Sequence, residues 1–260
     1  MGIVISLANQ KGGVAKTTSC VNIGAGLAMR DYKTLLIDFD PQASLSRYLG
    51  LPDKGPAVED WVMERELFKN VVSETKYNFL HAVPATENLK GEEMNMQMDY
   101  FKSCRYLPRA VEKVRELYDF ILIDTLPSFS LLFVNSLAAC DYVLIPVKLE
   151  FLSMQGISLL QTKIRDVRDN IKPVELMGIV GTFHRRGVKE SETCLQELHE
   201  KLSEFSFNTV VHMNSKLAES AAHSMPIQHY EMKSQGAQDY ESLIEEVIDR
   251  CKQRKHAEAL

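Results

Sequence analysis

The stretch Asn9-Gln-Lys-Gly-Gly-Val-Ala-Lys-Thr-Thr18 decides the fold of this chain. It follows a short apolar run at residues 3–8 and precedes a segment of helical period at residues 16–30. A strand, a glycine-rich turn and a helix N-terminus together form a phosphate cradle, because backbone N–H groups and the helix dipole point inward. Lys11 and Lys16 bracket this loop, although an ordinary phosphate-binding loop needs only one lysine. The second lysine therefore calls for an explanation.

Apolar, β-branched runs alternate along the chain with longer segments of helical period. Strands are expected at residues 2–8, 34–38, 79–83, 119–124, 142–147 and 175–182. Helices are expected at residues 16–30, 42–49, 87–101, 105–118, 129–139, 152–170, 190–205 and 235–253. This alternation predicts an α/β fold with a mostly parallel central sheet and helices on both faces. No long linker or internal repeat is evident, so we expect a single domain over residues 1–260.

The composition limits the partners that the whole surface can attract. The 260 residues carry a net charge of −5, so the chain is no polycation and any nucleic-acid binding must come from a local basic patch. No apolar run reaches the length of a membrane span. Five scattered cysteines without a Cys-x-x-Cys pair indicate reduced thiols, and the seven histidines form no recognisable metal-binding frame.

The chemistry of the loop residues predicts how a nucleotide would be held. Lys16 is placed to bridge the β- and γ-phosphates as a point charge. The Thr17 hydroxyl is placed to ligate Mg²⁺, and Thr18 lies one residue deeper in the helix, where it can reach the α-phosphate. The residues expected to contact the nucleotide in this loop are Lys11, Gly12, Gly13, Val14, Ala15, Lys16, Thr17 and Thr18.

Three aspartates end two of the expected strands. Asp124 closes an apolar strand, where its carboxylate can hold Mg²⁺ directly or through water; the alternative is a simple strand-end cap. Asp38 and Asp40 occupy alternate positions at the end of another strand, just before the chain turns at Pro41. Each of these two could instead be an ordinary turn acid.

The order Lys-Gly-Gly-Val-x-Lys-Thr-Thr at residues 11–18 resembles the deviant P-loop of the ParA/MinD ATPases. The resemblance extends over nearly the whole chain, through residues 35–42, the Walker B-like strand at 120–125, residues 135–147 and residues 216–227. It is strongest with the short, Soj-like chromosome or plasmid partition ATPases. Because the loop begins at residue 9, we expect no N-terminal DNA-reading domain. The resemblance implies a P-loop NTPase that binds ATP and Mg²⁺ and hydrolyses ATP slowly.

The resemblance also implies roles for single residues. Lys11 would reach across a homodimer interface to the phosphates of the other subunit's ATP, supplying positive charge during γ-phosphoryl transfer. Asp40 would orient the attacking water, with Asp38 nearer the Mg²⁺ shell. The alternative for Lys11 is an ordinary solvated loop lysine.

Several positions depart from the family pattern, among them Ala15, Leu126, His212 and Ala221. Ala15 stands where the family usually has Gly; at a positive φ it costs about 1 kcal/mol or more, whereas at a negative φ it is nearly neutral. His212 stands where the family often has Pro, near the expected adenine pocket, and an ordinary surface histidine is the alternative. The resemblance places the base contacts at Thr182, Phe183, His212 and Met213.

Basic residues gather late in the chain. The resemblance favours Arg185, Arg186 and Lys216 as contacts to DNA phosphates without sequence preference, and a solvated surface is the alternative reading. The tail at residues 248–260 has only a thin apolar face, so membrane binding of the MinD type is not expected.

The leading functional hypothesis is a partition ATPase. ATP would close a homodimer, the dimer would bind DNA nonspecifically in the cytoplasm on the nucleoid, and a ParB-like partner would stimulate hydrolysis and release. Glu150 and Glu219 are acids available to a basic partner peptide. The alternatives are a positioning ATPase for another cargo, a nucleotide-gated regulatory switch with negligible turnover, a MinD-like membrane ATPase and a metabolic P-loop ligase.

Overall fold

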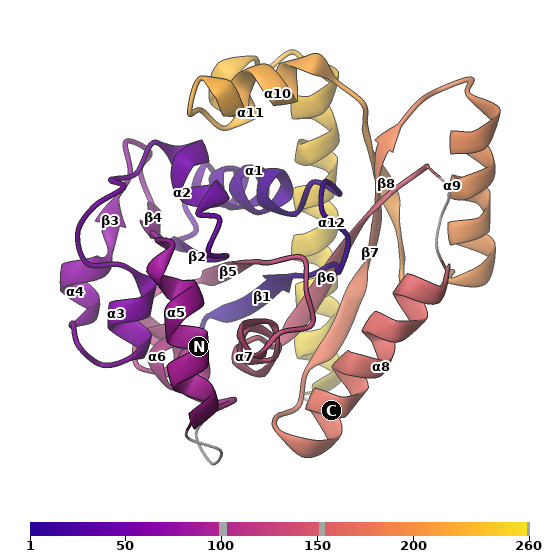
Figure 1. Cartoon of the computed structure of the whole chain (residues 1–260). Helices are drawn as coiled ribbons and strands as arrows, with labels where there is room; N and C mark the ends of the chain where they lie inside the picture. The colour runs from indigo at the N-terminus through magenta and orange to yellow at the C-terminus, as the bar shows by residue number, and fades with distance from the viewer. Residues whose placement is uncertain (99–102, 151–153, 259–260) are drawn as a thin grey trace.

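The computed structural model describes residues 1–98, 103–150 and 154–258, without the side chains of residues 154–155 and 254–258. Within this part an eight-stranded sheet has the order β3-β4-β2-β5-β1-β6-β7-β8 (Figure 1). All neighbours pair in parallel except β3 with β4, which are antiparallel. The strands are β1 (Ile3–Leu7), β2 (Thr34–Phe39), β3 (Ser73–Glu74), β4 (Leu80–Val83), β5 (Phe120–Thr125), β6 (Tyr142–Lys148), β7 (Glu175–His184) and β8 (Ser206–His212).

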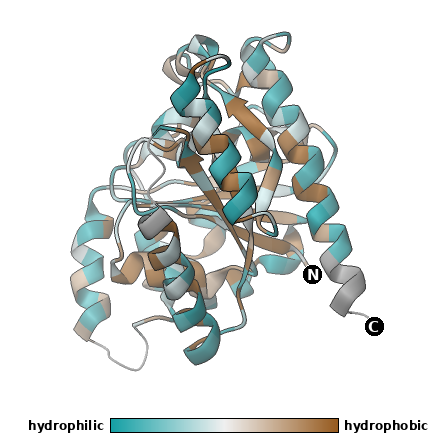
Figure 2. Cartoon of the chain, turned by 90° about the vertical axis from the view of Figure 1, so that its right-hand side faces the viewer, coloured by the Kyte–Doolittle hydropathy of each residue, from teal (hydrophilic) through white to brown (hydrophobic). Residues whose placement is uncertain are grey.

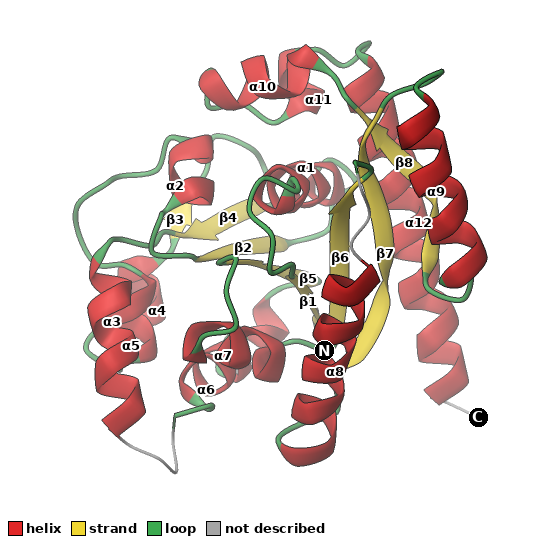
Figure 3. Ribbon diagram, turned by 45° about the vertical axis from the view of Figure 1, so that its right-hand side comes forward, coloured by secondary structure: helices red, strands yellow, loops and turns green. Residues whose placement is uncertain are grey.

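Helices cover both faces of the sheet (Figure 3). One face is packed by α1 (Lys16–Ala28), α2 (Ser44–Leu49), α10 (Ser215–Ala222), α11 (Ile227–Tyr230) and α12 (Gln235–Glu258). The other is packed by α3 (Val58–Val62), α4 (Phe68–Val71), α5 (Asn88–Met98), α6 (Tyr106–Glu112), α7 (Leu131–Ala139), α8 (Met154–Asn170) and α9 (Lys189–Lys201), and a 3-10 turn η1 (Arg115–Leu117) precedes β5. The predicted α/β fold with a mostly parallel, doubly covered sheet is confirmed.

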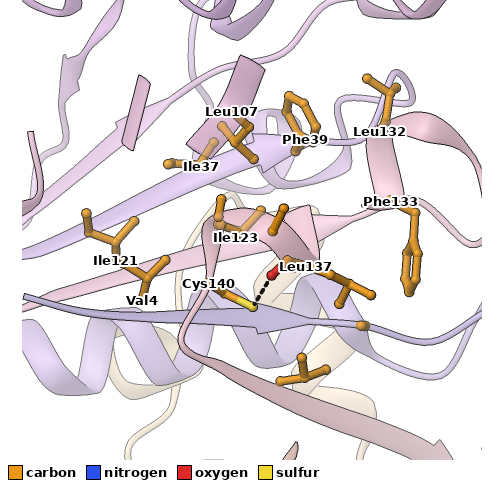
Figure 4. Packing of buried hydrophobic residues seen from close by; sticks show 14 of the residues in the cluster. Val4, Ile37, Phe39, Leu107, Ile121, Ile123, Leu132, Phe133, Leu137 and Cys140 are labelled. Carbon is orange, nitrogen blue, oxygen red and sulfur yellow. Dashed lines mark hydrogen bonds between the residues drawn. The ribbon is translucent and has the colours of Figure 1, made fainter. Parts of the chain in front are cut away.

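The central strands are apolar along their whole length because both of their faces are buried. Every residue of β1, β2 and β5 is buried, and the hydrophobic strands lie between helices whose outer sides are hydrophilic (Figure 2). Phe133 and Leu137 of α7 belong to the same cluster of buried hydrophobic side chains as Ile123 of β5 (Figure 4). The Cys140 thiol donates a hydrogen bond to the Leu137 carbonyl oxygen at 3.3 Å, closing the turn from α7 into β6.

The register of the sheet gathers the acids at one edge. Parallel strands present their carboxyl ends together, and ligand sites of α/β proteins form there. The pairing of β2 with β5 sets Asp38 directly beside Asp124, and the pairing of β1 with β5 sets Leu7 on the other side of Asp124. The loop that leaves β1 therefore passes over both carboxylates.

The six expected strands are all present, within one or two residues of their predicted ends. Two strands, β3 and β8, and the short helices α3, α4, α10 and α11 were not predicted from the sequence. The helix expected at 105–118 is two pieces, because the backbone at Val114 leaves the helical region with φ −121°. Residues 99–101 and 152–153, the ends of two other expected helices, lie outside the described residues.

Candidate functional site

The glycine-rich loop joins β1 to α1 and is held at both flanks. Asn9 accepts a hydrogen bond from the Lys11 backbone N–H at 2.9 Å and donates one to the Pro146 carbonyl of β6 at 2.7 Å. On the other flank the Thr182 hydroxyl of β7 lies 3.2 Å from the Val14 carbonyl oxygen and 3.0 Å from the Val147 carbonyl oxygen. The loop is thus fastened to two neighbouring strands before any ligand arrives.

The two inner glycines leave the concave side of the loop open. Gly13 has a φ of +67°, and a Cβ added at Gly12 or Gly13 would meet no atom within 4 Å. That open space suits a group such as phosphate, which the backbone N–H groups at a helix N-terminus attract.

Ala15 adopts the left-handed conformation, with φ 68° and ψ 30°, directly before α1. Its carbonyl oxygen accepts the first helical hydrogen bond from the Ser19 N–H at 2.9 Å, so the strained residue is also the helix cap. Of the two cases that the sequence left open, the structure selects the positive φ. An L-residue with a Cβ costs about 1–2 kcal/mol in this region relative to the right-handed one. The strained residue of the loop is therefore the direct neighbour of Lys16.

The two lysines of the loop occupy opposite environments. Lys16 is 7% exposed, and its ammonium donates to the Lys11 carbonyl oxygen at 3.2 Å. Burial lowers the pKa of Lys16, while the charges of Asp124 and Asp40 act in the opposite direction. Lys11 is exposed, and no hydrogen bond or ion pair of its ammonium is found within the described residues. One lysine points into the site and the other into solvent.

Asp124 is fully buried at the end of β5. Its Oδ2 accepts a hydrogen bond from the Thr17 hydroxyl at 2.6 Å, whereas Oδ1 has no partner among the described residues. Burial, reinforced by the charge of Asp38, raises the pKa of Asp124 to about 8. A buried carboxylate with an unused oxygen is a group that a cation would stabilise.

Asp38 is equally buried but is already well supplied with donors. Its Oδ2 accepts hydrogen bonds from the Ser46 backbone N–H at 2.8 Å and the Ser46 hydroxyl at 2.7 Å, and its Oδ1 accepts from the Asp40 N–H at 3.3 Å. Burial raises the pKa of Asp38 to about 6, against the effect of these donors. Asp40, 7% exposed, turns its Oδ1 to the Gln42 N–H at 2.8 Å.

These side chains fit a magnesium ion better than a metal held wholly by protein. No cluster of three or more His, Cys, Asp or Glu side chains suited to a metal is found in the described part of the chain. Mg²⁺ usually takes one or two carboxylates and completes its shell with phosphate oxygens and water. The unpaired Oδ1 of Asp124 and the adjacent Thr17 hydroxyl match that requirement, and Asp38 lies beside them across the β2–β5 register.

The expected base contacts converge at the ends of β7 and β8. The backbone N–H and Nδ1 of His212 both lie within 3.1 Å of the Asp239 carboxylate, and its Nε2 accepts from Arg186 Nε at 3.0 Å. The His212 side chain is therefore held between Asp239 and Arg186 and is not an ordinary solvated histidine. His184, 6% exposed, packs edge-on against it with ring centroids 5.0 Å apart. Phe183 has a left-handed backbone, with φ 55°.

The expected DNA contacts lie nearby and each has an internal partner. Arg185 lies 3.4 Å from a Glu150 oxygen and contacts the Met213 sulfur, while Arg186 is held by His212. Lys216 pairs with Glu219 at 2.6 Å. Among the described residues, no helix is both long and apolar enough to cross a membrane.

Comparison with known proteins decides the family. A family model described as an AAA domain matches residues 2–176. The chromosome-partitioning ATPase Soj of Treponema pallidum (strain Nichols) is 35% identical over 255 residues, covering 98% of this chain and 100% of that protein. The chain belongs to the ParA/MinD family of deviant Walker A ATPases. The resemblance drawn from the loop at residues 9–18 is confirmed.

Two further relatives of this ParA/MinD family protein show the breadth of the likeness. The sporulation initiation inhibitor protein Soj of Bacillus subtilis (strain 168) is 35% identical over 251 residues, which cover 95% of this chain and 98% of that protein. Cobyrinic acid a,c-diamide synthase from Mycobacterium smegmatis, solved with bound ADP and magnesium, superposes with a TM-score of 0.81 at 28% identity, covering 97% and 96% of the two chains.

The structure also reveals site residues that the sequence reasoning passed over. Asn9 lies in the stretch at residues 9–18, and its role could have been predicted from the sequence. An Asn side chain often forms an Asx turn, in which it accepts a hydrogen bond from the backbone N–H two residues later. Ser46, which holds Asp38, and Asp239, which holds His212, gave no local signal. Asp239 lies 27 residues beyond His212, so only the packing of α12 along β8 brings them together.

Proposed function

We propose that the protein is an ATP-dependent, dimerising partition ATPase. The observation that carries the proposal is the contrast within one loop: Lys16 is buried in the site, and the Lys11 ammonium has no partner in the described part of the chain. A lysine that serves no internal group, beside a phosphate cradle, is suited to the phosphates of a second subunit. The similarity to the chromosome-partitioning ATPase Soj of Treponema pallidum supports a role in partition.

Bound ATP with Mg²⁺ would bring the transferable γ-phosphoryl group and the divalent charge that the buried acids lack. Lys16 would bind the β- and γ-phosphates, and Thr17 and Asp124 would hold the metal. Asp38 fixes the turn that carries Asp40, and Asp40 would orient the attacking water. Lys11 of each protomer completes the site of the other, which makes hydrolysis depend on dimerisation.

Dimerisation also joins two copies of the surface formed by Arg185, Arg186 and Lys216. That doubled surface binds DNA phosphates without sequence preference, so the affinity falls steeply as salt rises. A ParB-like partner stimulates hydrolysis, which is slow without it, and returns the protein from the nucleoid to the cytoplasm.

A nucleotide-gated switch with negligible turnover is the second candidate, and the left-handed Ala15 favours it. The strain lies one residue from Lys16, so a small shift of the loop would misplace the ammonium. Binding would then survive while hydrolysis, which depends on position, would suffer more.

One experiment tests the main proposal. Binding to a 60-base-pair duplex and phosphate release are measured with ADP, ATP and a slowly hydrolysed ATP analogue, at two salt concentrations. We expect DNA retention with ATP and the analogue only, and weaker retention at the higher salt. DNA binding that is equal with ADP and ATP would rule out nucleotide control of DNA binding. Slow phosphate release without a partner is expected of the ATPase, and only its complete absence would favour the second candidate.

The role of Lys11 is tested separately. Lys11→Ala is expected to retain ATP binding but to lose ATP-dependent dimerisation, because the charge supplied across the interface is gone. Light scattering measures the mass with the slowly hydrolysed analogue, and Lys54→Ala, another exposed loop lysine, is the matched control. A dimer of wild-type strength in Lys11→Ala would contradict the role.

A further inference from the structure

Two of the three cations proposed for DNA already face carboxylates within the protomer. Lys216 lies 2.6 Å from Glu219, and Arg185 lies 3.4 Å from Glu150, which is itself 2.8 Å from Lys148. A phosphate that approaches Lys216 or Arg185 therefore meets a cation that is already paired with an acid. Binding is an exchange of one anion for another, not the filling of empty positions.

Glu219 is the better anchored of the two acids. The oxygen that faces Lys216 also accepts a hydrogen bond from the Tyr230 hydroxyl at 3.0 Å, which reaches it from α11. The hydrogen bonds from Lys216 and Tyr230 hold the pKa of Glu219 below its usual range. The carboxylate thus stays ionised, and Tyr230 keeps it in place even when Lys216 turns away.

The backbone around this pair is also fixed. Asn214 caps α10, because its side chain accepts the Lys216 backbone N–H at 2.8 Å. Lys216 and Glu219 are three residues apart on that helix, so their side chains share one face. The two side chains remain neighbours as long as α10 is formed.

We propose that Glu219 is an internal counter-ion that competes with nucleic-acid phosphate for Lys216 and so weakens DNA binding by each protomer. The inference rests on the proposed function, since it assigns a regulator to the surface that binds DNA. Lys216 must leave Glu219 before it can pair with a phosphate, so part of the attraction between the ammonium and the phosphate is spent on breaking the internal pair. This exchange reduces the affinity for DNA, and a dimer presents two copies of the pair.

The test compares wild type with Glu219→Gln, Lys216→Gln and the double variant on a 60-base-pair duplex, with the slowly hydrolysed ATP analogue and Mg²⁺. Fluorescence anisotropy gives Kd between 50 and 200 mM salt. Glu219→Gln should bind about 3- to 10-fold more tightly. In the Lys216→Gln background the same change should have less than about a third of that effect, because the competition needs the ammonium.

The matched control is Glu197→Gln on α9. Glu197 forms an intrahelical pair with Lys201, and the exposed side-chain fractions of the two pairs are alike, 51%/39% against 45%/39%. Glu197→Gln removes the same charge and leaves the Lys216–Glu219 pair intact, so the Kd of this variant for DNA should stay within about 2-fold of wild type. Equal tightening by Glu197→Gln and Glu219→Gln would overturn the proposal in favour of a general charge effect.

The remaining outcomes separate this proposal from the proposed function. If wild type binds DNA and Glu219→Gln binds no better, the counter-ion role fails while the DNA-binding function stands. If wild type does not bind but Glu219→Gln does, the counter-ion role is supported and nonspecific DNA binding by the natural protein fails. If neither protein binds, both proposals fail.

Discussion

The buried carboxyl edge of the sheet and the outer surface at α10 both carry charged side chains, but in opposite environments. At the carboxyl edge of the sheet, Asp38 and Asp124 lie side by side, fully buried, and one oxygen of Asp124 has no partner among the described residues. On the outer surface at α10, the Lys216 ammonium and the Glu219 carboxylate neutralise each other in solvent. The first region places neighbouring carboxylates and Lys16 at low dielectric, where ionising the carboxylates is costly, and the second is balanced at high dielectric.

This difference indicates that ligand binding should be strong in the buried region and sensitive to conditions at the surface region. A cation that enters the buried region removes a large electrostatic penalty, because interactions there are little screened. An anion that reaches the surface region only replaces another anion, with modest gain and high sensitivity to salt. The buried region is suited to a committed chemical step, and the surface region to a reversible contact.

The largest effect is expected from the buried region. Asp40→Ala should lower the rate of ATP hydrolysis at least about 100-fold, because the variant lacks the group proposed to orient the water but keeps Lys16 and Thr17, the residues proposed to hold the phosphates and the metal. Phosphate release and nucleotide binding are measured in parallel. Asp53→Ala, an exposed loop aspartate, is the matched control and should keep the wild-type rate. A rate within a factor of two of wild type would remove Asp40 from the mechanism.

The pH dependence of the free energy of unfolding tests the cost of ionising the buried carboxylates of Asp124 and Asp38. The folded-state pKa values of Asp124 and Asp38, about 8 and about 6, lie above the ordinary aspartate value. The folded nucleotide-free protein therefore binds more protons than the unfolded chain, and its stability should fall as pH rises from about 4 to 8.

Asp124→Asn should flatten that profile. The amide keeps an acceptor for Thr17 but carries no charge, so at pH 8.5 its Tm should exceed that of wild type by several degrees, at about 2–4 °C per kcal/mol. Scanning calorimetry without nucleotide or Mg²⁺ measures both proteins between pH 5 and 8.5. Parallel Tm curves for the two proteins would show that the buried carboxylate is not the source of the slope.

A smaller effect is expected at the loop itself. Ala15→Gly should stabilise the protein by about 1 kcal/mol, because glycine adopts the left-handed conformation without the Cβ penalty. Urea unfolding provides the free energy. Ala28→Gly, the same change at the far end of α1, should instead destabilise the protein by about 1 kcal/mol or more. Loss of stability in Ala15→Gly would mean that the loop draws other support from the methyl group.

The smallest effect belongs to the balanced surface. Lys216→Gln should leave Tm within about 2 °C of wild type, since exposed ion pairs contribute little to folding. The measurement uses the same calorimetric protocol at pH 7.5. A larger fall would assign Lys216 a structural role and would change how its DNA-binding variants are interpreted.

The sequence predicted the buried half of the architecture better than the exposed half. Central strands such as β5 are apolar throughout, so their signal survives without knowledge of their neighbours. The edge strand β8 alternates, with Phe207 and Val211 buried and Asn208 exposed, and was missed. Helices α10 and α11 are short and depend on α1, where Asn22 accepts the Ile227 N–H at 2.7 Å.

The candidate site divides in the same manner. The loop, Thr17 and Asp124 are brought together as their local pattern predicted, because strand ends and a helix start are encoded nearby in the chain. The environments of His212 and Lys216 depend on Asp239 and Tyr230, which come from other helices. Nor could the sequence decide the backbone angle of Ala15, since Ala is compatible with both signs of φ at different cost.

The pairing of β1 has a consequence for how the protein is made. β1 precedes the phosphate loop, and its partners among the described strands are β5 and β6, more than a hundred residues later in the chain. On a ribosome that adds about 5–20 residues per second, the first strand waits on the order of 10 s for its neighbours. Until then its apolar residues are unpaired and the loop has no fixed shape. We therefore expect nucleotide binding to begin late in synthesis, after β1 has paired with β5 and β6 at the centre of the sheet.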